Sequence, residues 1–136
     1  MHPQKRLQDH PGAWFGMSIQ EGIRIAEKIT LSFGLDSIEG LGTDSDGDFT
    51  VDGEYDPSTE SVMLVRRYTY SPKNPSQVGY PFIYRGKWDG YCVHGRWMMS
   101  TNPGLGGEFE MWPEQESEFE EQMKEYSQQM REAVAR

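Results

Sequence analysis

Apolar and polar residues alternate with a period of two along most of the chain, from residue 13 to about residue 112. In the segment 26–33, for example, Ile29, Leu31 and Phe33 alternate with polar neighbours. This period places one set of side chains in a core and the other in solvent, as in a half-buried β-strand. Turn-forming residues interrupt the pattern at the regular intervals that are typical of an all-β sandwich or barrel.

The alternation divides into eight expected strands. Turns such as Asp46-Gly47 and Asp89-Gly90 lie between them, and Asp-Gly accepts the positive φ angles that tight hairpins need. Short turns favour antiparallel pairing of strands that are neighbours in sequence. The expected strands cover residues 14–20, 26–33, 37–43, 48–55, 62–70, 80–88, 91–98 and 107–112.

Eight sequential antiparallel strands leave two unpaired edges unless the sheet closes or stacks on a second sheet. A sandwich would bury the same alternating faces, but the long crossovers of a Greek-key sandwich are missing. The sequence therefore predicts an all-β fold, an eight-stranded antiparallel up-and-down meander barrel over residues 13–112. A barrel of eight strands has an interior that side chains fill or that holds one small ligand.

The two ends of the chain have different patterns. Residues 1–12 are polar, contain two prolines and predict a flexible tail. From Pro113 onward the period becomes helical, with glutamates crowding the start and arginines at the end, a polarity that suits the helix dipole. We expect a helix over 113–136 that packs on the barrel wall or across a mouth, or that forms a homodimer. Its apolar stripe comprises Phe119, Met123, Tyr126, Met130 and Val134.

Composition narrows the class of protein. The 136 residues carry a formal net charge of -9, which argues against a general nucleic-acid binder with its basic surface. No apolar run is long enough for a membrane span. A single cysteine excludes a disulfide framework within the chain. Together with the absence of an export signal in the first twenty residues, this predicts a cytoplasmic location.

Two motifs resemble a known group of barrels. Gly12-Ala13-Trp14 is similar to the G-x-W signature that opens the first strand of lipocalin and avidin barrels, the calycin group. A second segment resembles small barrel modules of this kind, with Gly40, Gly42, Asp44, Gly47, Phe49, Gly53 and Tyr55 in place. The resemblance spans about residues 12–112. It implies a barrel that binds small molecules, and it names no ligand, because the T-D-Y lipocalin motif and the biotin contacts of avidins are missing.

The alternation also indicates which side chains line the interior. We expect a small-molecule binding module for a partly apolar or anionic ligand. The alternatives are a ligand-free structural or protein-interaction barrel that acts through its helix and outer face, and a barrel isomerase or cyclase. The expected lining residues are Phe49, Val51, Tyr55, Arg66, Tyr68, Phe82, Tyr84, Val93, Trp97 and Phe109.

Arg66 is the unusual member of this set. It falls in phase with Val62, Leu64 and Tyr68, so its guanidinium is expected among apolar side chains. Burial of a charge without an acceptor is expensive, and Arg66 therefore requires a carboxylate, a stacking ring or an anionic ligand. The favoured interpretation is a structural arginine stacked on Trp14 or Trp97. The alternative is a forked anchor for a ligand carboxylate or phosphate.

Other chemistry-bearing residues predict no reaction. Asp44, Asp46 and Asp48 have the spacing of a calcium loop, but the required Gly and Glu are missing further on, so an acidic hairpin turn is expected. His94 is expected on the outer face without a partner at metal-ligand spacing. Cys92 shares that face and has no assignable base. The sequence contains no recognisable nucleophile, phosphate or zinc motif, and it implies no metal and no cofactor.

Overall fold

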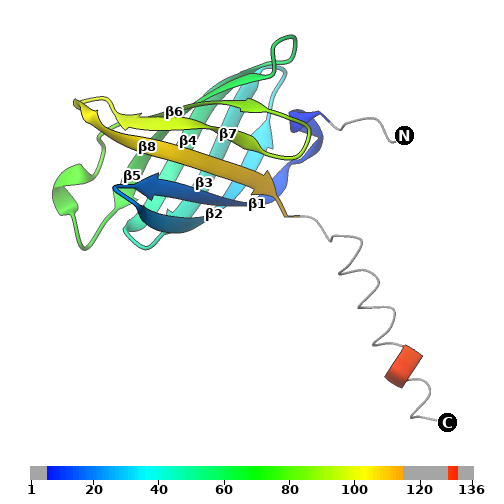
Figure 1. The fold of residues 1–136 in the computed structure, drawn as a ribbon, viewed down its shortest axis with the longest axis horizontal. Helices are drawn as coiled ribbons and strands as arrows, with labels where there is room; N and C mark the ends of the chain where they lie inside the picture. The colour runs from blue at the N-terminus through cyan, green and yellow to red at the C-terminus, as the bar shows by residue number, and fades with distance from the viewer. Residues whose placement is uncertain (1–5, 115–128, 132–136) are drawn as a thin grey trace.

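The computed structural model describes residues 6–114 and 129–131, and its main feature is a closed barrel of eight strands (Figure 1). Each strand pairs antiparallel with the next one in sequence, so the expected meander is confirmed. The strands are β1 Gly12–Gln20, β2 Ile23–Phe33, β3 Ser37–Asp44, β4 Gly47–Asp56, β5 Ser61–Tyr70, β6 Phe82–Trp88, β7 Val93–Met99 and β8 Asn102–Pro113.

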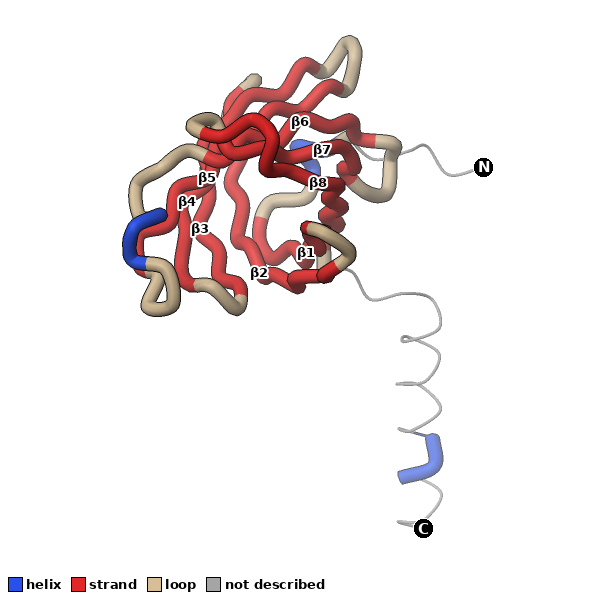
Figure 2. The backbone as a smooth tube through the Cα atoms, turned by 60° about the vertical axis from the view of Figure 1, so that its left-hand side comes forward, coloured by secondary structure: helices blue, strands red, loops and turns tan. Residues whose placement is uncertain are grey.

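Closure depends on the pairing of the first and last strands. β1 and β8 run antiparallel in a register that joins Trp14 to Pro113 and Ser18 to Phe109. The wall is therefore continuous, as the tube in Figure 2 shows, and the sheet has no exposed edge strand. The pairing of β1 with β8 therefore identifies a single closed sheet rather than two stacked layers.

Several strand boundaries differ from the sequence expectation. β6 and β7 begin at Phe82 and Val93, and the two tyrosines expected to start them, Tyr80 and Tyr91, are exposed outside the strands. β8 begins at Asn102, five residues before its expected start. Pro103 and Gly104 made that segment look like a loop, but it pairs with β7 across a register shift at Met98 and Met99.

The turns divide between two ends of the barrel. One end, called the closed end here, carries the connections 34–36, 57–60 and 89–92 and the two chain segments at Gly12 and Pro113. The other, the open end, carries the short turns 21–22, 45–46 and 100–101 and the long connection 71–81. Because the strands alternate in direction, every second connection falls at the same end.

Part of the segment expected as a tail is packed against the closed end. The 3-10 helix η1, Leu7–Asp9, places Leu7 in the core. The next residues approach two tryptophans: the Nε1 of Trp14 donates to the carbonyl oxygen of His10, and the His10 ring lies 5.5 Å from that of Trp88. An isolated leucine in a polar segment has no period, which is why the alternation did not identify it.

The expected helix start at Pro113 is wrong. β8 continues through Pro113, which pairs with Trp14 and is buried. Most of the expected helix lies outside the described residues. Within them, Gln129, Met130 and Arg131 are helical, and no helix in the described part of the chain is long and apolar enough to cross a membrane.

The core runs through the middle of the barrel, and close backbone approach shapes it at one point. Gly42 on β3 faces inward beside Phe49, and a Cβ there would lie 2.4 Å from the phenyl ring. The missing side chain therefore leaves room for the ring of Phe49, which also contacts Tyr68 and the guanidinium of Arg66.

Candidate functional site

The open half of the barrel contains a row of six aromatic rings. Phe49 of β4, Tyr68 of β5 and Phe82 of β6 are successive neighbours, with 5.8 Å between the centroids of each pair. The row continues from Phe82 to Trp97 at 6.1 Å and from Trp97 to Tyr84 at 6.3 Å. Tyr84 then meets Phe109 edge-on at 5.1 Å. These separations are those of favourable aromatic pairs.

Arg66 lies between two of these rings and forms a buried ion pair. Its guanidinium carbon is 4.0 Å from the centroid of Tyr84 and 4.8 Å from that of Phe49. Both terminal nitrogens donate to Glu27, with Nη2 3.0 Å from Oε1 and Nη1 bonded to Oε2. Both side chains are almost entirely removed from solvent. The pair therefore supplies the acceptor that a buried guanidinium requires.

The expected surroundings of Arg66 need correction. Its stacking partners are Phe49 and Tyr84, not Trp14 or Trp97. Trp14 lies at the closed end, and Trp97 stacks on Tyr84 instead. Burial alone lowers the pKa of Arg66, but the charge of the Glu27 carboxylate and its hydrogen bonds to the guanidinium raise that pKa above the ordinary value, so the guanidinium stays charged. With Glu27 bound, this charge is neutralised before any ligand arrives.

Glu27 is the residue that sequence reasoning missed. It lies in the same phase as Ile29 and Leu31 on β2, so its inward orientation followed from the alternation. The alternation places one acidic residue on the inward face of β2 and one arginine on the inward face of β5. This combination could have identified the ion pair from the sequence. The carboxylate also requires Gly16 opposite it on β1, because a Cβ at Gly16 would lie 2.5 Å from Oε1 of Glu27.

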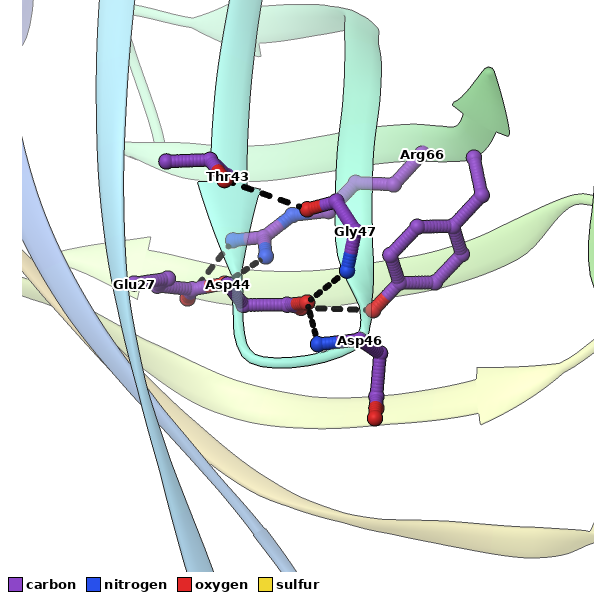
Figure 3. A network of polar contacts seen from close by, with 7 residues as sticks. Glu27, Thr43, Asp44, Asp46, Gly47 and Arg66 are labelled. Carbon is purple, nitrogen blue, oxygen red and sulfur yellow. Dashed lines mark hydrogen bonds and ion pairs between the residues drawn. The ribbon is translucent and has the colours of Figure 1, made fainter. Parts of the chain in front are cut away.

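Asp44 organises the turn beside the aromatic row (Figure 3). Its Oδ1 accepts hydrogen bonds from the backbone N–H groups of Asp46 and Gly47, at 2.8 and 3.1 Å, and its Oδ2 accepts one from the Tyr68 hydroxyl at 2.5 Å. Burial and the hydrogen bond to Asp44 raise the pKa of Tyr68, so the phenol remains a donor. The acidic segment is a hairpin turn, as expected, and the Asp44 side chain is used to fix it.

The connection 71–81 is held against the same end of the barrel. The Ser71 hydroxyl donates to the carbonyl oxygen of Asp46 at 2.9 Å, and Gln77 donates to that hydroxyl at 2.9 Å. The N–H of Gly79 donates to the carbonyl oxygen of Tyr68, and Val78 forms a β-bridge with Tyr68. The connection therefore lies along the rim beside β5 and the Asp46-Gly47 turn.

Solvent reaches the two halves of the interior unequally. The tryptophan pair of the closed end is sealed, with 0% of Trp14 and 1% of Trp88 exposed, although Phe33 beside Trp14 is half-buried. Those of the open half retain accessible surface: 8% of Phe82, 7% of Tyr84 and 6% of Trp97, while Tyr68 is only half-buried. Four rings near the open end thus keep more accessible surface than the tryptophan pair of the closed end.

All ten expected lining residues face the interior. Nine are buried and Tyr68 is half-buried. The structure brings seven of them together in the open half, namely Phe49, Arg66, Tyr68, Phe82, Tyr84, Trp97 and Phe109. Tyr55 and Val93 lie toward the closed end, and Val51 pairs with Arg66 at mid-barrel. A role of the seven in ligand binding stays a prediction.

The polar residues on the outer face form a turn and no metal site. His94 is exposed as expected, and its Nε2 lies 3.6 Å from Oδ2 of Asp89. Burial, with the nearby Asp89 carboxylate, raises the pKa of Cys92 to about 11, so its thiol is protonated at neutral pH and is a poor nucleophile. Across the described ranges, no three acidic, His or Cys side chains gather as a metal ion would require.

Comparison with known proteins does not assign a family or a function to this site. Neither a scan against protein-family models nor a search of curated proteins finds a match to the chain.

Proposed function

We propose that the protein is a calycin-like binding module that takes a small, partly apolar and uncharged or cationic molecule at the open end of the barrel. One observation carries the proposal: Tyr68, Phe82, Tyr84 and Trp97 of this half keep accessible surface, whereas the paired tryptophans of the closed end, Trp14 and Trp88, have almost none. The G-x-W motif at Gly12 and the closed eight-stranded meander support the likeness to calycins.

The shape of the site favours a flat, partly apolar ligand. Tyr68, Phe82 and Trp97 present ring faces and edges over a short distance, and ligand sites are commonly lined in this way. The Tyr68 hydroxyl and the Ser18 hydroxyl, which also faces inward, add polar groups that can orient such a ligand.

The charges of the site disfavour an anion. Arg66 would have been the anchor for a carboxylate or phosphate, but Glu27 already occupies both of its terminal nitrogens. Around the open end, four carboxylates, those of Glu21, Asp44, Asp46 and Asp48, outnumber two cations, Arg24 and Lys73. An incoming anion would therefore meet a net negative rim, whereas a neutral or cationic molecule would not.

A structural or protein-interaction barrel is the second candidate. The unbroken row of six rings favours it, because side chains already occupy most of the open half. The two candidates differ in whether the accessible surface near Trp97 is large enough to hold a ligand.

Three probes that share one ring system and differ in charge test the proposal. We expect calorimetric titration to show binding of indole and tryptamine, with indole-3-acetate weaker by about tenfold, or about 1.4 kcal/mol. Native mass spectrometry of freshly purified protein is the companion measurement, because a copurified ligand appears directly as added mass.

A matched pair of variants locates the binding. Phe82→Ala removes a ring of the open half and should weaken tryptamine binding, whereas Tyr91→Ala removes an exposed ring at the closed end and should leave it unchanged. If no probe binds and no added mass is present, the proposal fails and the structural barrel is favoured. Preferential binding of indole-3-acetate would overturn the charge argument.

A further inference from the structure

The outer face of β1 is apolar along its whole length, unlike the outer faces of its neighbours. Its four outward positions alternate with the buried Trp14, Gly16 and Ser18. Trp112 of β8 pairs beside one end of this row, and Ala26 of β2 pairs beside its middle. We call these four positions the outer stripe: Ala13, Phe15, Met17 and Ile19.

The sequence beyond the barrel predicts a second apolar row. The helical stripe expected there runs from Phe119 to Val134, and its one described member, Met130, is 51% exposed. On the outer stripe, Ala13 is exposed and the other three side chains are half-buried. Contact between the two rows would remove further apolar area from water, which is the main driving force for docking.

The two rows match in length and, at one end, in the charges beside them. The outer stripe extends over six residue steps of a strand, about 20 Å. The helical stripe would extend over fifteen steps of a helix, about 22 Å. Lys28 flanks the stripe beside Phe15, and Glu110 flanks it beside Met17. The glutamates of residues 116–121 would therefore lie beside Lys28, while Arg131 would lie between Glu110 and Arg24, the residue that pairs with Ile19.

The exit point of the chain places this segment beside the outer stripe. The N–H of Glu114 donates to the carbonyl oxygen of Ala13 at 2.9 Å, so β8 leaves the wall at the first residue of the stripe. Residues 115–118 can reverse the chain before Phe119. A tether this short gives an effective concentration in the millimolar range. A net charge of -9 on each chain opposes docking onto a second copy instead.

We propose that residues 115–136 fold back as a helix on the outer stripe of the same chain, running parallel to β1. Phe119 would lie nearest Ala13, and Val134 nearest Ile19. The helix would shield Trp112 at the same time. This surface is on the outside of the wall, so the proposal is independent of ligand binding at the open end.

Paramagnetic relaxation in the full-length chain tests the inference. A nitroxide is attached to Ser127→Cys in a Cys92→Ser background, because Cys92 is the only native cysteine. We expect the amide signals of Phe15 and Met17 to lose most of their intensity, while those of Met63 on the opposite wall keep theirs. Unchanged β1 signals would overturn the proposal.

Two kinds of control distinguish docking within one chain from docking onto a second copy and from a general loss of structure. Mixing isotope-labelled chains without nitroxide with unlabelled nitroxide-bearing chains should give no loss, because a loss would show docking onto a second copy and overturn the proposal. Met17→Asp should abolish the intramolecular loss. Met63→Asp, at a half-buried outward position on β5, should not. Met130→Asp should act as Met17→Asp does, and equal effects of Met17→Asp and Met63→Asp would count against docking.

Discussion

The two ends of the barrel are built from similar residues but differ in what covers them. At the closed end Trp14 and Trp88 pack against each other and against His10, and Leu7 of the 3-10 helix η1 joins the same core. At the open end Trp97, Phe82 and Tyr68 pack equally closely, yet solvent reaches them.

The difference shows that ring packing alone does not seal a barrel. The closed end has a segment from outside the sheet seated against it, whereas the 71–81 connection lies along the rim of the open end and is fixed by Ser71 and Gln77. Stability is therefore expected to depend more on side chains of the closed end, and ligand binding on those of the open end. The predictions below test this division.

The largest effect is expected from breaking the buried ion pair of Glu27 and Arg66, which lies at mid-barrel between the two ends. Glu27→Leu leaves Arg66 charged and without an acceptor, which should lower the free energy of unfolding by about 3–5 kcal/mol. The double variant Glu27→Leu, Arg66→Met removes both charges and should recover most of that loss. Urea unfolding of both variants checks this, and a double variant no more stable than the single one would contradict it.

The second effect compares one leucine at each end. Leu7→Ala at the closed end, where 1% of the side chain is exposed, should cost about 2–4 kcal/mol. Leu105→Ala at the open end should cost about 1 kcal/mol or less, because Leu105 is only half-buried and water can fill the space. Thermal or urea unfolding gives both values. Equal losses would show that η1 does not seal the barrel.

The third effect is a loss of stability in alkali. Burial raises the pKa of Tyr84 above its ordinary 10.0. The unfolded chain releases this proton near pH 10 while the folded barrel keeps it, so the stabilisation is complete below pH 10 and declines as the pH rises. The expected slope is about 1.4 kcal/mol per pH unit for this tyrosine. Urea midpoints between pH 9 and 11 measure it, and an unchanged slope in Tyr84→Phe would refute it.

The smallest effect concerns the rim of the open end. Tyr68→Phe removes the hydrogen bond from the phenol to Asp44 and should cost about 1 kcal/mol, because the group is only half-buried and water replaces part of the bond. In the same variant, the loss of binding free energy for tryptamine should be larger than the loss in the free energy of unfolding. A normal tryptamine affinity in this variant would place the ligand away from Tyr68.

The sequence predicts the barrel well because local alternation determines which side of each strand is buried. Phe49, Tyr84 and Phe109 were all placed inside on this basis, and short turns determined the order of the strands. Strand boundaries were harder to predict where the alternation is interrupted, as at Pro103 and Gly104. A strand that begins with proline and glycine shows no alternation of apolar and polar side chains.

The candidate site was predicted only in part because its key pairing joins distant positions. Arg66 and Glu27 are 39 residues apart, and the partner of a buried charge depends on how strands are placed around the barrel. The need for an acceptor followed from the chemistry, but its identity did not. The sealing by Leu7 was not predicted for a similar reason, since a single apolar residue has no period.

The four tryptophans allow a direct test of the division between the two ends. The Nε1–H of Trp97 donates to the carbonyl oxygen of Ile19 at the open end, and that of Trp14 donates to His10 at the closed end. In an ¹⁵N-labelled full-length chain titrated with tryptamine, the indole signal of Trp97 should shift while those of Trp14 and Trp88 stay fixed. Shifts confined to Trp14 and Trp88, or no shift at saturating tryptamine, would contradict a binding site at the open end.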